Sequence, residues 1–259
     1  VVDKIAACII LEGYLEKFPE GLFHLQAHYY AADCLFRNGQ NERALPHFEA
    51  VAAAGRNNYT ERSLQNAANI AYNLGNFTKA IDLYEQMVKV AGSDNVHIAG
   101  LVGILRCWNR LGDRDSIISS AKTLLDEQKL TPELRDEALI LMARTYYADS
   151  NTFVQADSLY DLLKSSTNGE YCGEASYRIA EMRYLQHDYA GAERAIETII
   201  SDPASAYYLA KSFILWADIF YARGNKMQAK QTLQSIIDNY DGDDLVQLAL
   251  EKRNAILQE

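Results

Sequence analysis

The sequence predicts an all-α fold in which pairs of antiparallel helices are stacked in tandem. Apolar residues recur at i, i+3, i+4 and i+7 throughout the chain, and no segment shows the sustained alternation of a strand. Glycine-containing turns recur at Gly39, Gly75 and Gly112, and a fourth turn, at Gly224, follows after about three more periods of the same length. A repeat of about 37 residues is typical of units that bury their apolar faces against each other.

Each predicted unit contains a first helix, A, and a second helix, B, joined at the turn. Residues 3–18 have the pattern of a B helix without its A partner, so we expect the chain to be part of a longer array. Residues 245–259 are amphipathic and suit a capping helix with a charged outer face. We therefore expect one continuous stack over 1–259, with six helix pairs at 22–55, 59–91, 95–128, 132–166, 170–201 and 205–240.

Local signals support the individual elements. The segment Thr131-Pro132-Glu133 combines a capping threonine, a proline in the first turn and an acid near the positive end of the helix dipole, which predicts a helix start. The fourth pair has an extra residue near Asn151, and the fifth pair has Gln186-His187-Asp188 at its turn and no glycine. These departures affect local geometry and leave the helical pattern intact.

Composition excludes several classes of protein. A net charge of −10 argues against electrostatic binding of nucleic acid, and no apolar run approaches the roughly 18 residues that a membrane-spanning helix needs. Four widely spaced cysteines, Cys8, Cys34, Cys107 and Cys172, are expected to be small buried residues. His24 and His28 have a spacing that can bind a metal, but no third ligand is evident. No phosphate-binding loop or nucleophile motif is present, so we expect no catalytic site, cofactor or metal.

Aligned repeats share columns of small residues. Helix A has one such column and helix B has another, and larger residues flank both. The column on helix A is Ala32, Ala68, Leu105, Ala143, Ala180 and Ala217. The column on helix B is Ala44, Ala80, Ile117, Ala156, Ala192 and Ala229. Small residues let the two helices approach closely, while the large ones fill the space between units.

This pattern resembles the tetratricopeptide repeat, whose B helix carries Ala-x-x-x-aromatic. The resemblance covers nearly the whole chain and implies a right-handed superhelix with the A helices along a concave groove. It does not extend to the family's carboxylate clamp, because Tyr29, Gln65 and Val102 stand where a lysine is expected. The segment from Tyr14 to Gly21 resembles repeat proteins of bacterial cell envelopes, of the Tol–Pal and outer-membrane assembly type. That likeness implies a periplasmic location, with the cytoplasm left as an alternative.

The resemblance also indicates which residues face the groove. Three A-helix columns, spaced i, i+4 and i+7, should point into it; the second changes sign along the array and the third is aromatic in five of six repeats. Tyrosine offers a rigid apolar face with a polar tip, and arginine orients acidic groups. The predicted groove residues are Asn69, Tyr72, Arg106, Arg110, Arg144, Tyr147, Tyr177, Glu181, Tyr184, Asp218 and Tyr221. The same residues could instead pack or pair internally, for example Arg144 with Glu181.

We expect a non-enzymatic scaffold that binds a partner protein or peptide in this groove. One alternative is an accessory that handles carbohydrate or peptidoglycan, because tyrosine-lined grooves also stack sugars. Another is the recruiting arm of an enzyme whose catalytic part lies outside this chain. Residue patterns do not indicate the oligomeric state.

Overall fold

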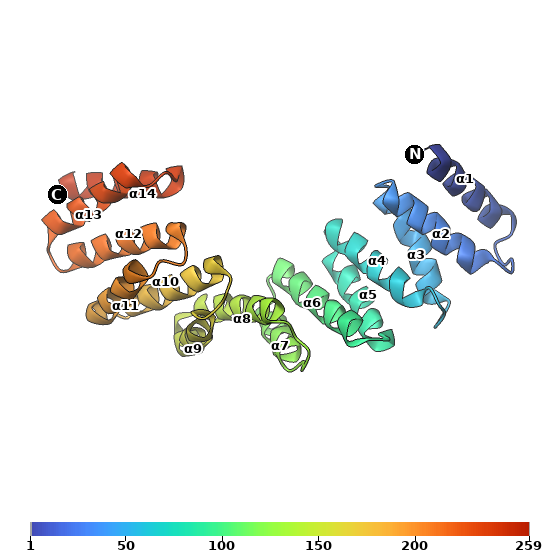
Figure 1. The fold of residues 1–259 in the computed structure, drawn as a ribbon, viewed down its shortest axis with the longest axis horizontal. Helices are drawn as coiled ribbons and strands as arrows, with labels where there is room; N and C mark the ends of the chain where they lie inside the picture. The colour runs from blue at the N-terminus through green and yellow to red at the C-terminus, as the bar shows by residue number, and fades with distance from the viewer. Residues whose placement is uncertain (1, 259) are drawn as a thin grey trace. The chain divides into compact units, whose positions relative to one another are not determined.

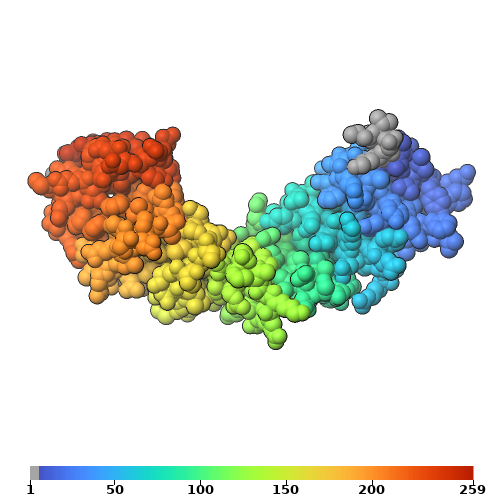
Figure 2. Space-filling view, in the orientation of Figure 1, coloured from blue at the N-terminus to red at the C-terminus, as the bar shows by residue number. Residues whose placement is uncertain are grey.

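The computed structural model describes residues 2–258, and their side chains from residue 6 onward. Over this range the chain forms fourteen α-helices, one short 3₁₀ turn and no strand, which confirms the all-α prediction (Figure 1). The helices divide into two compact units, residues 1–134 and 135–259, which are coloured from blue to green and from green to red (Figure 2). The single stack expected over 1–259 stays a prediction.

The N-terminal unit contains seven helices and the first residues of an eighth. Helix α1 packs on α2, and each later helix through α7 packs on the one before it. The helices are α1 (Val2–Lys17), α2 (His24–Arg37), α3 (Asn41–Ala53), α4 (Thr60–Asn73), α5 (Phe77–Val90), α6 (Asp94–Leu111) and α7 (Arg114–Leu125).

The C-terminal unit contains the rest of α8 and the helices after it. A 3₁₀ turn at Ser150–Thr152 accommodates the extra residue of the fourth pair. The helices are α8 (Pro132–Tyr147), α9 (Phe153–Leu163), α10 (Gly169–Leu185), α11 (Tyr189–Ser201), α12 (Ala206–Ala222), α13 (Lys226–Asn239) and α14 (Asp243–Gln258). All of these helix ends lie within three residues of the positions that the sequence indicates.

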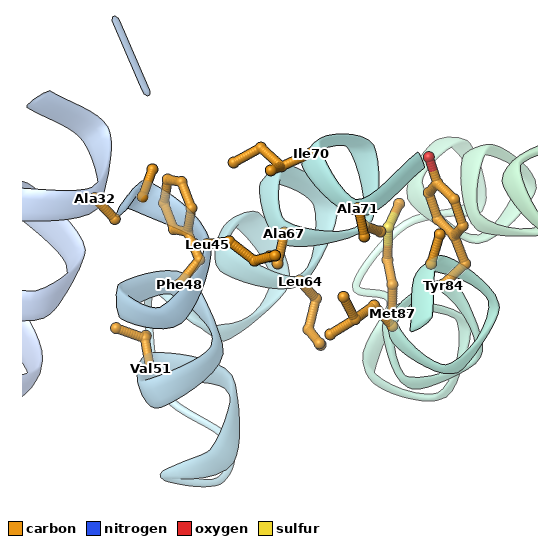
Figure 3. Packing of buried hydrophobic residues seen from close by; sticks show 14 of the residues in the cluster. Ala32, Leu45, Phe48, Val51, Leu64, Ala67, Ile70, Ala71, Tyr84 and Met87 are labelled. Carbon is orange, nitrogen blue, oxygen red and sulfur yellow. The ribbon is translucent and has the colours of Figure 1, made fainter. Parts of the chain in front are cut away.

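The column alanines Ala44, Ala68 and Ala80 are fully buried in the N-terminal core, and neighbouring alanines are buried with them. In the N-terminal core, Ala67 of α4 lies next to Leu45 of α3, and Ala71 lies next to Met87 of α5 (Figure 3). Ala67, Ala71 and Met87 are fully buried. Similar clusters around Ala192 and Ala229 form the cores of the C-terminal unit. Close contact between alanine and a large side chain buries apolar area at each helix interface, and this burial stabilises the stack.

Turns between A and B helices use the left-handed backbone conformation that the glycines predict. Gly39, Gly75, Gly112 and Gly224 all have φ between 74° and 81°. His187 occupies the corresponding turn of the fifth pair and has φ of 62°. Its backbone N–H bonds to the Tyr184 carbonyl, as that of Gly224 bonds to the Tyr221 carbonyl. The fifth turn therefore keeps the shape of the others without a glycine.

Candidate functional site

A cavity of about 540 Å³ opens among helices α4, α5 and α6 of the N-terminal unit. Three of the predicted groove residues line it: Asn69 and Tyr72 from α4, and Arg106 from α6. The lining combines apolar side chains with amide, hydroxyl and guanidinium groups. The remaining lining residues are Phe36, Asn73, Tyr84, Ala99, Val102, Gly103 and Leu134.

The floor of this cavity is held by a contact between α4 and α5. The Tyr84 hydroxyl donates a hydrogen bond to the Asn69 side-chain oxygen at 2.6 Å, which fixes the orientation of the amide. Burial raises the pKa of Tyr84 to about 12, so the hydroxyl keeps its proton at neutral pH. A methyl group at Gly103 would lie 2.5 Å from the Tyr84 ring, so this position of α6 must be glycine for the ring to fit.

Arg110 is not part of the cavity lining. Its guanidinium lies 5.3 Å from the centre of the Phe77 ring, and Tyr72 packs edge-on against the same ring at 5.4 Å. A cation over an aromatic face is attracted by the ring quadrupole. Arg110 and one edge of the Tyr72 ring therefore pack against Phe77.

In the C-terminal unit, Arg144 is paired with a different partner from the one considered in the sequence. Its guanidinium binds both oxygens of Glu174, at 2.8 and 2.5 Å. The alternative prediction, that Arg144 pairs with Glu181, is therefore wrong. Tyr208 donates a third hydrogen bond to Glu174 at 3.1 Å. Burial alone would raise the pKa of Glu174, but the hydrogen bonds and charge of Arg144 outweigh burial, and the pKa is lowered.

Glu181 forms the centre of a second polar cluster. The hydroxyls of Tyr147 and Tyr177 donate to its two oxygens at 2.6 and 2.7 Å, and Arg178 pairs with it at 2.5 Å. Arg178 also lies over the Tyr147 ring at 4.5 Å. Lys211 lies 4.5 Å from the centre of the Tyr177 ring. These contacts give the cluster a fixed geometry before any ligand binds.

The first of the three predicted groove columns lies four residues before the column whose charge changes sign. Its side chains are largely packed against neighbouring helices. Tyr177 is only 6% exposed, so it supports Glu181 from below and offers almost no surface of its own to a ligand. The expectation that this column points into an open groove is corrected by the burial of most of its members: Tyr29, Val102, Ile140, Tyr177 and Ile214. Tyrosine and branched side chains at this position fill the space between consecutive A helices.

The remaining predicted residues lie further along the C-terminal unit. Asp218 pairs with Lys252 of the capping helix α14 at 2.8 Å, and burial raises its pKa despite that lysine. Tyr184 packs on Tyr189 at the start of α11. Tyr221 is 37% exposed, with the ammonium of Lys226 5.9 Å from its ring centre. The aromatic column therefore also packs against the first turn of the following B helix.

Several residues of these sites were not predicted from the sequence. Tyr84 and Asn73 belong to the α4–α6 cavity, and Gly103 inside a helix was a signal of close approach that could have indicated it. Glu174 and Arg178 of the C-terminal clusters lie one turn away from the predicted columns. The i, i+4 spacing of Glu174 and Arg178 along α10 was the sequence signal that could have indicated them.

No metal site is formed within the part of the chain that the structure describes. The Nδ1 atoms of His28 and His47 lie 2.9 Å apart, so His28 contacts a B helix and is not paired with His24. No described helix is long and apolar enough to cross a membrane.

Comparison with known proteins identifies the repeat. Tetratricopeptide-repeat family models match residues 11–59 and 204–243. No curated protein matches the chain. The two matches identify tetratricopeptide repeats in these segments, and the other helix pairs continue the same tandem arrangement.

Solved structures share this fold at low sequence identity. The C-terminal part of a repeat protein from Cytophaga hutchinsonii is 14% identical, with 95% of this chain and 94% of that chain covered and a TM-score of 0.65. YrrB, described as having an unusual peptide-binding site, is 12% identical, with 78% and 96% covered and a TM-score of 0.53. PilW, described as a type IV pilus biogenesis factor, is 16% identical, with 89% and 100% covered and a TM-score of 0.52.

Proposed function

We propose that this protein is a non-enzymatic scaffold that binds an extended segment of a partner protein on its A-helix face. The observation that carries the proposal is the 540 Å³ cavity between α4 and α6, which gathers Asn69, Tyr72 and Arg106 from two consecutive A helices. Its mixed apolar and polar lining suits a side chain and the adjoining peptide backbone. Repeat folds of this kind bind partners along extended surfaces.

Pre-organisation also supports binding at this cavity. The Asn69 amide is already held by Tyr84, and Gly103 lets the Tyr84 ring lie flat against α6. A partner therefore does not need to order these groups when it binds, which lowers the entropic cost of association. Arg106 also brings a guanidinium to the cavity lining, a group with several N–H donors that suits carboxylate or amide oxygens of a partner segment.

We further propose that the partner belongs to the bacterial cell envelope. The support is the segment from Tyr14 to Gly21, which resembles envelope repeat proteins of the Tol–Pal and outer-membrane assembly type. The description of PilW as a pilus biogenesis factor agrees with this location. Cell fractionation of the tagged protein tests the proposal, and recovery only in the cytoplasm would contradict it.

The binding proposal is tested by filling the cavity. Ala99→Trp adds a large side chain to the lining without removing a charge or a hydrogen bond, and Ala53→Trp makes the same change at the exposed end of α3. We expect wild type and Ala53→Trp to retain the same partner in affinity capture from the source organism, and Ala99→Trp to lose it. Equal capture by all three proteins, with equal helical content by circular dichroism, would contradict the proposal.

A further inference from the structure

The fifth repeat has polar residues at two positions that are mainly apolar in the other repeats. Four residues before the A-helix alanine, the column is His28, Leu64, Leu101, Leu139, Ser176 and Phe213. Three residues after the alanine, the column is Leu35, Ala71, Trp108, Tyr146, Arg183 and Phe220. In the fifth repeat these positions are Ser176 and Arg183, both on α10, and the other polar member of the two columns is His28. A charged residue in a packing column costs stability, so its presence calls for a compensating interaction.

Ser176 and Arg183 line the same cavity, of about 280 Å³, between α10 and α11. Since a water molecule occupies about 30 Å³ of liquid, the space has room for a side chain and its hydrated head group. Arg194 contributes a second guanidinium from α11. The other lining residues are Lys164, Ile179, Gly191, Ala195, Thr198 and Ile199. None of the predicted groove residues is among them, so this is a separate site from the A-helix columns.

The two arginines of this cavity differ from three other arginines of the unit. Arg144, Arg178 and Arg223 are each paired with a glutamate. The Nε–H of Arg183, like that of Arg178, is buried with no hydrogen-bond partner among the described residues. Neither Arg183 nor Arg194 forms an ion pair within the described part of the chain, although the protein carries ten more acidic than basic charges.

Nearby charges leave the cavity positive. Lys164 is paired with Asp161 at 2.7 Å, so it adds little. Asp157 and Asp188 line a second cavity that Arg183 also borders, and the Asp188 carboxylate accepts the Gly191 N–H at the start of α11. The described cavity lining itself contains no carboxylate. Two guanidinium groups around an open space are the arrangement that binds carboxylates and other oxyanions.

We propose that the cavity between α10 and α11 is an oxyanion site that binds the carboxylate of an acidic side chain from a partner protein. The Arg183 guanidinium donates to one carboxylate oxygen, and the exposed Arg194 supplies the second positive group. This site is independent of the A-helix cavity and would give the protein a second docking point on a different set of residues.

The test is an NMR titration that follows the arginine Nε–Hε resonances of the full chain at low ionic strength. The probes are a capped Gly-Glu-Gly peptide, the neutral Gly-Gln-Gly peptide and inorganic phosphate. We expect the Arg183 resonance to shift with the glutamate peptide, with a Kd on the order of 1 mM for a single carboxylate contact, and not with the glutamine peptide. A shift with phosphate alone would overturn the assignment to an acidic side chain.

Variants separate binding from folding. Arg183→Leu restores the apolar packing column and should fold normally while weakening glutamate-peptide binding about tenfold. Arg194→Gln, at an exposed position, should weaken binding in the same direction. Arg62→Gln removes one exposed positive charge from α4 and serves as the matched control, with unchanged affinity expected. Affinity that is unchanged in both Arg183→Leu and Arg194→Gln would overturn the proposal.

Discussion

At the residue scale, His187 holds a backbone conformation that other repeats give to glycine. The left-handed region costs a non-glycine residue roughly 1–2 kcal/mol, because its Cβ approaches the backbone. The His187 ring recovers part of that cost by a 3.2 Å contact with the Tyr189 hydroxyl. The turn is therefore formed by the repeat's packing and its backbone hydrogen bonds, against the local preference of the residue.

We predict that His187→Gly stabilises the protein by about 0.5 kcal/mol, since relief of strain exceeds the entropy cost of glycine and the lost ring contact. Gly224→Ala, at the equivalent turn with φ of 81°, should destabilise it by about 1 kcal/mol. Urea unfolding midpoints measure both changes. A loss of stability in His187→Gly would show that the Tyr189 contact outweighs the backbone strain.

Arg144 is a structural partner of Glu174 as well as a predicted groove residue. Glu174 has a side chain only 5% exposed, so removing its arginine leaves a carboxylate without its main counter-charge. We predict that Arg144→Met destabilises the C-terminal unit by about 2 kcal/mol, less than for a fully buried pair because Arg144 is 47% exposed.

Arg37→Met is the matched control for this prediction. Arg37 pairs with Asp33 at 2.7 Å, but its side chain is 55% exposed and the pair lies along one helix. The expected loss is about 0.5 kcal/mol or less. Equal unfolding free energies for the two variants in urea would contradict a structural role for the Arg144–Glu174 pair.

At the element scale, the contact between α2 and α3 contains a pair of histidines. The Nδ1 atoms of His28 and His47 can share a hydrogen bond only while at least one of the rings is neutral. Burial, and then the charge of His47, lowers the pKa of His28, and burial lowers that of His47. Glu12 and Arg43 face His47 from α1 and α3, and Glu12 acts against the lowering.

The sign of the pH effect follows from the lowered pKa values. Below about pH 6.5 these histidines bind protons in the unfolded state that they do not bind in the folded state. Their contribution to the free energy of unfolding is therefore fully present above that pH, and it is lost as the pH falls through their folded-state pKa values. We predict that His28→Leu, which matches Leu64 and Leu101 in the same column, loses less unfolding free energy between pH 7.5 and 5.5 than wild type. Urea unfolding at both pH values measures this, and equal losses would be the contrary result.

The helical elements could be predicted closely because their signals are local. Glycine turns, the Thr131 cap and the alanine columns each act within one repeat, so helix ends agree within three residues. The pairing of Arg144 with Glu174 could not be predicted in the same way. Spacing along one helix shows which residues share a face, but the offset between neighbouring helices comes from side-chain packing.

At the scale of the whole molecule, each unit has its own arrangement of predicted groove residues. In the N-terminal unit three of them line an open cavity, whereas in the C-terminal unit Arg144, Tyr147, Tyr177 and Glu181 are tied into hydrogen-bonded clusters. The column pattern alone treats these repeats as equivalent. The difference arises from Glu174 and Arg178, which satisfy the polar groups internally.

Binding of a partner protein at the α4–α6 cavity is tested most directly by site-specific photo-crosslinking in the source organism. A photoreactive residue replaces Asn73, an exposed member of the cavity lining, or Ala53, at the exposed end of α3. We expect a discrete crosslinked protein from position 73 that is absent from position 53 and is lost when Ala99→Trp fills the cavity. A partner that crosslinks equally from both positions, or that still crosslinks when the cavity is filled, would contradict binding at this cavity.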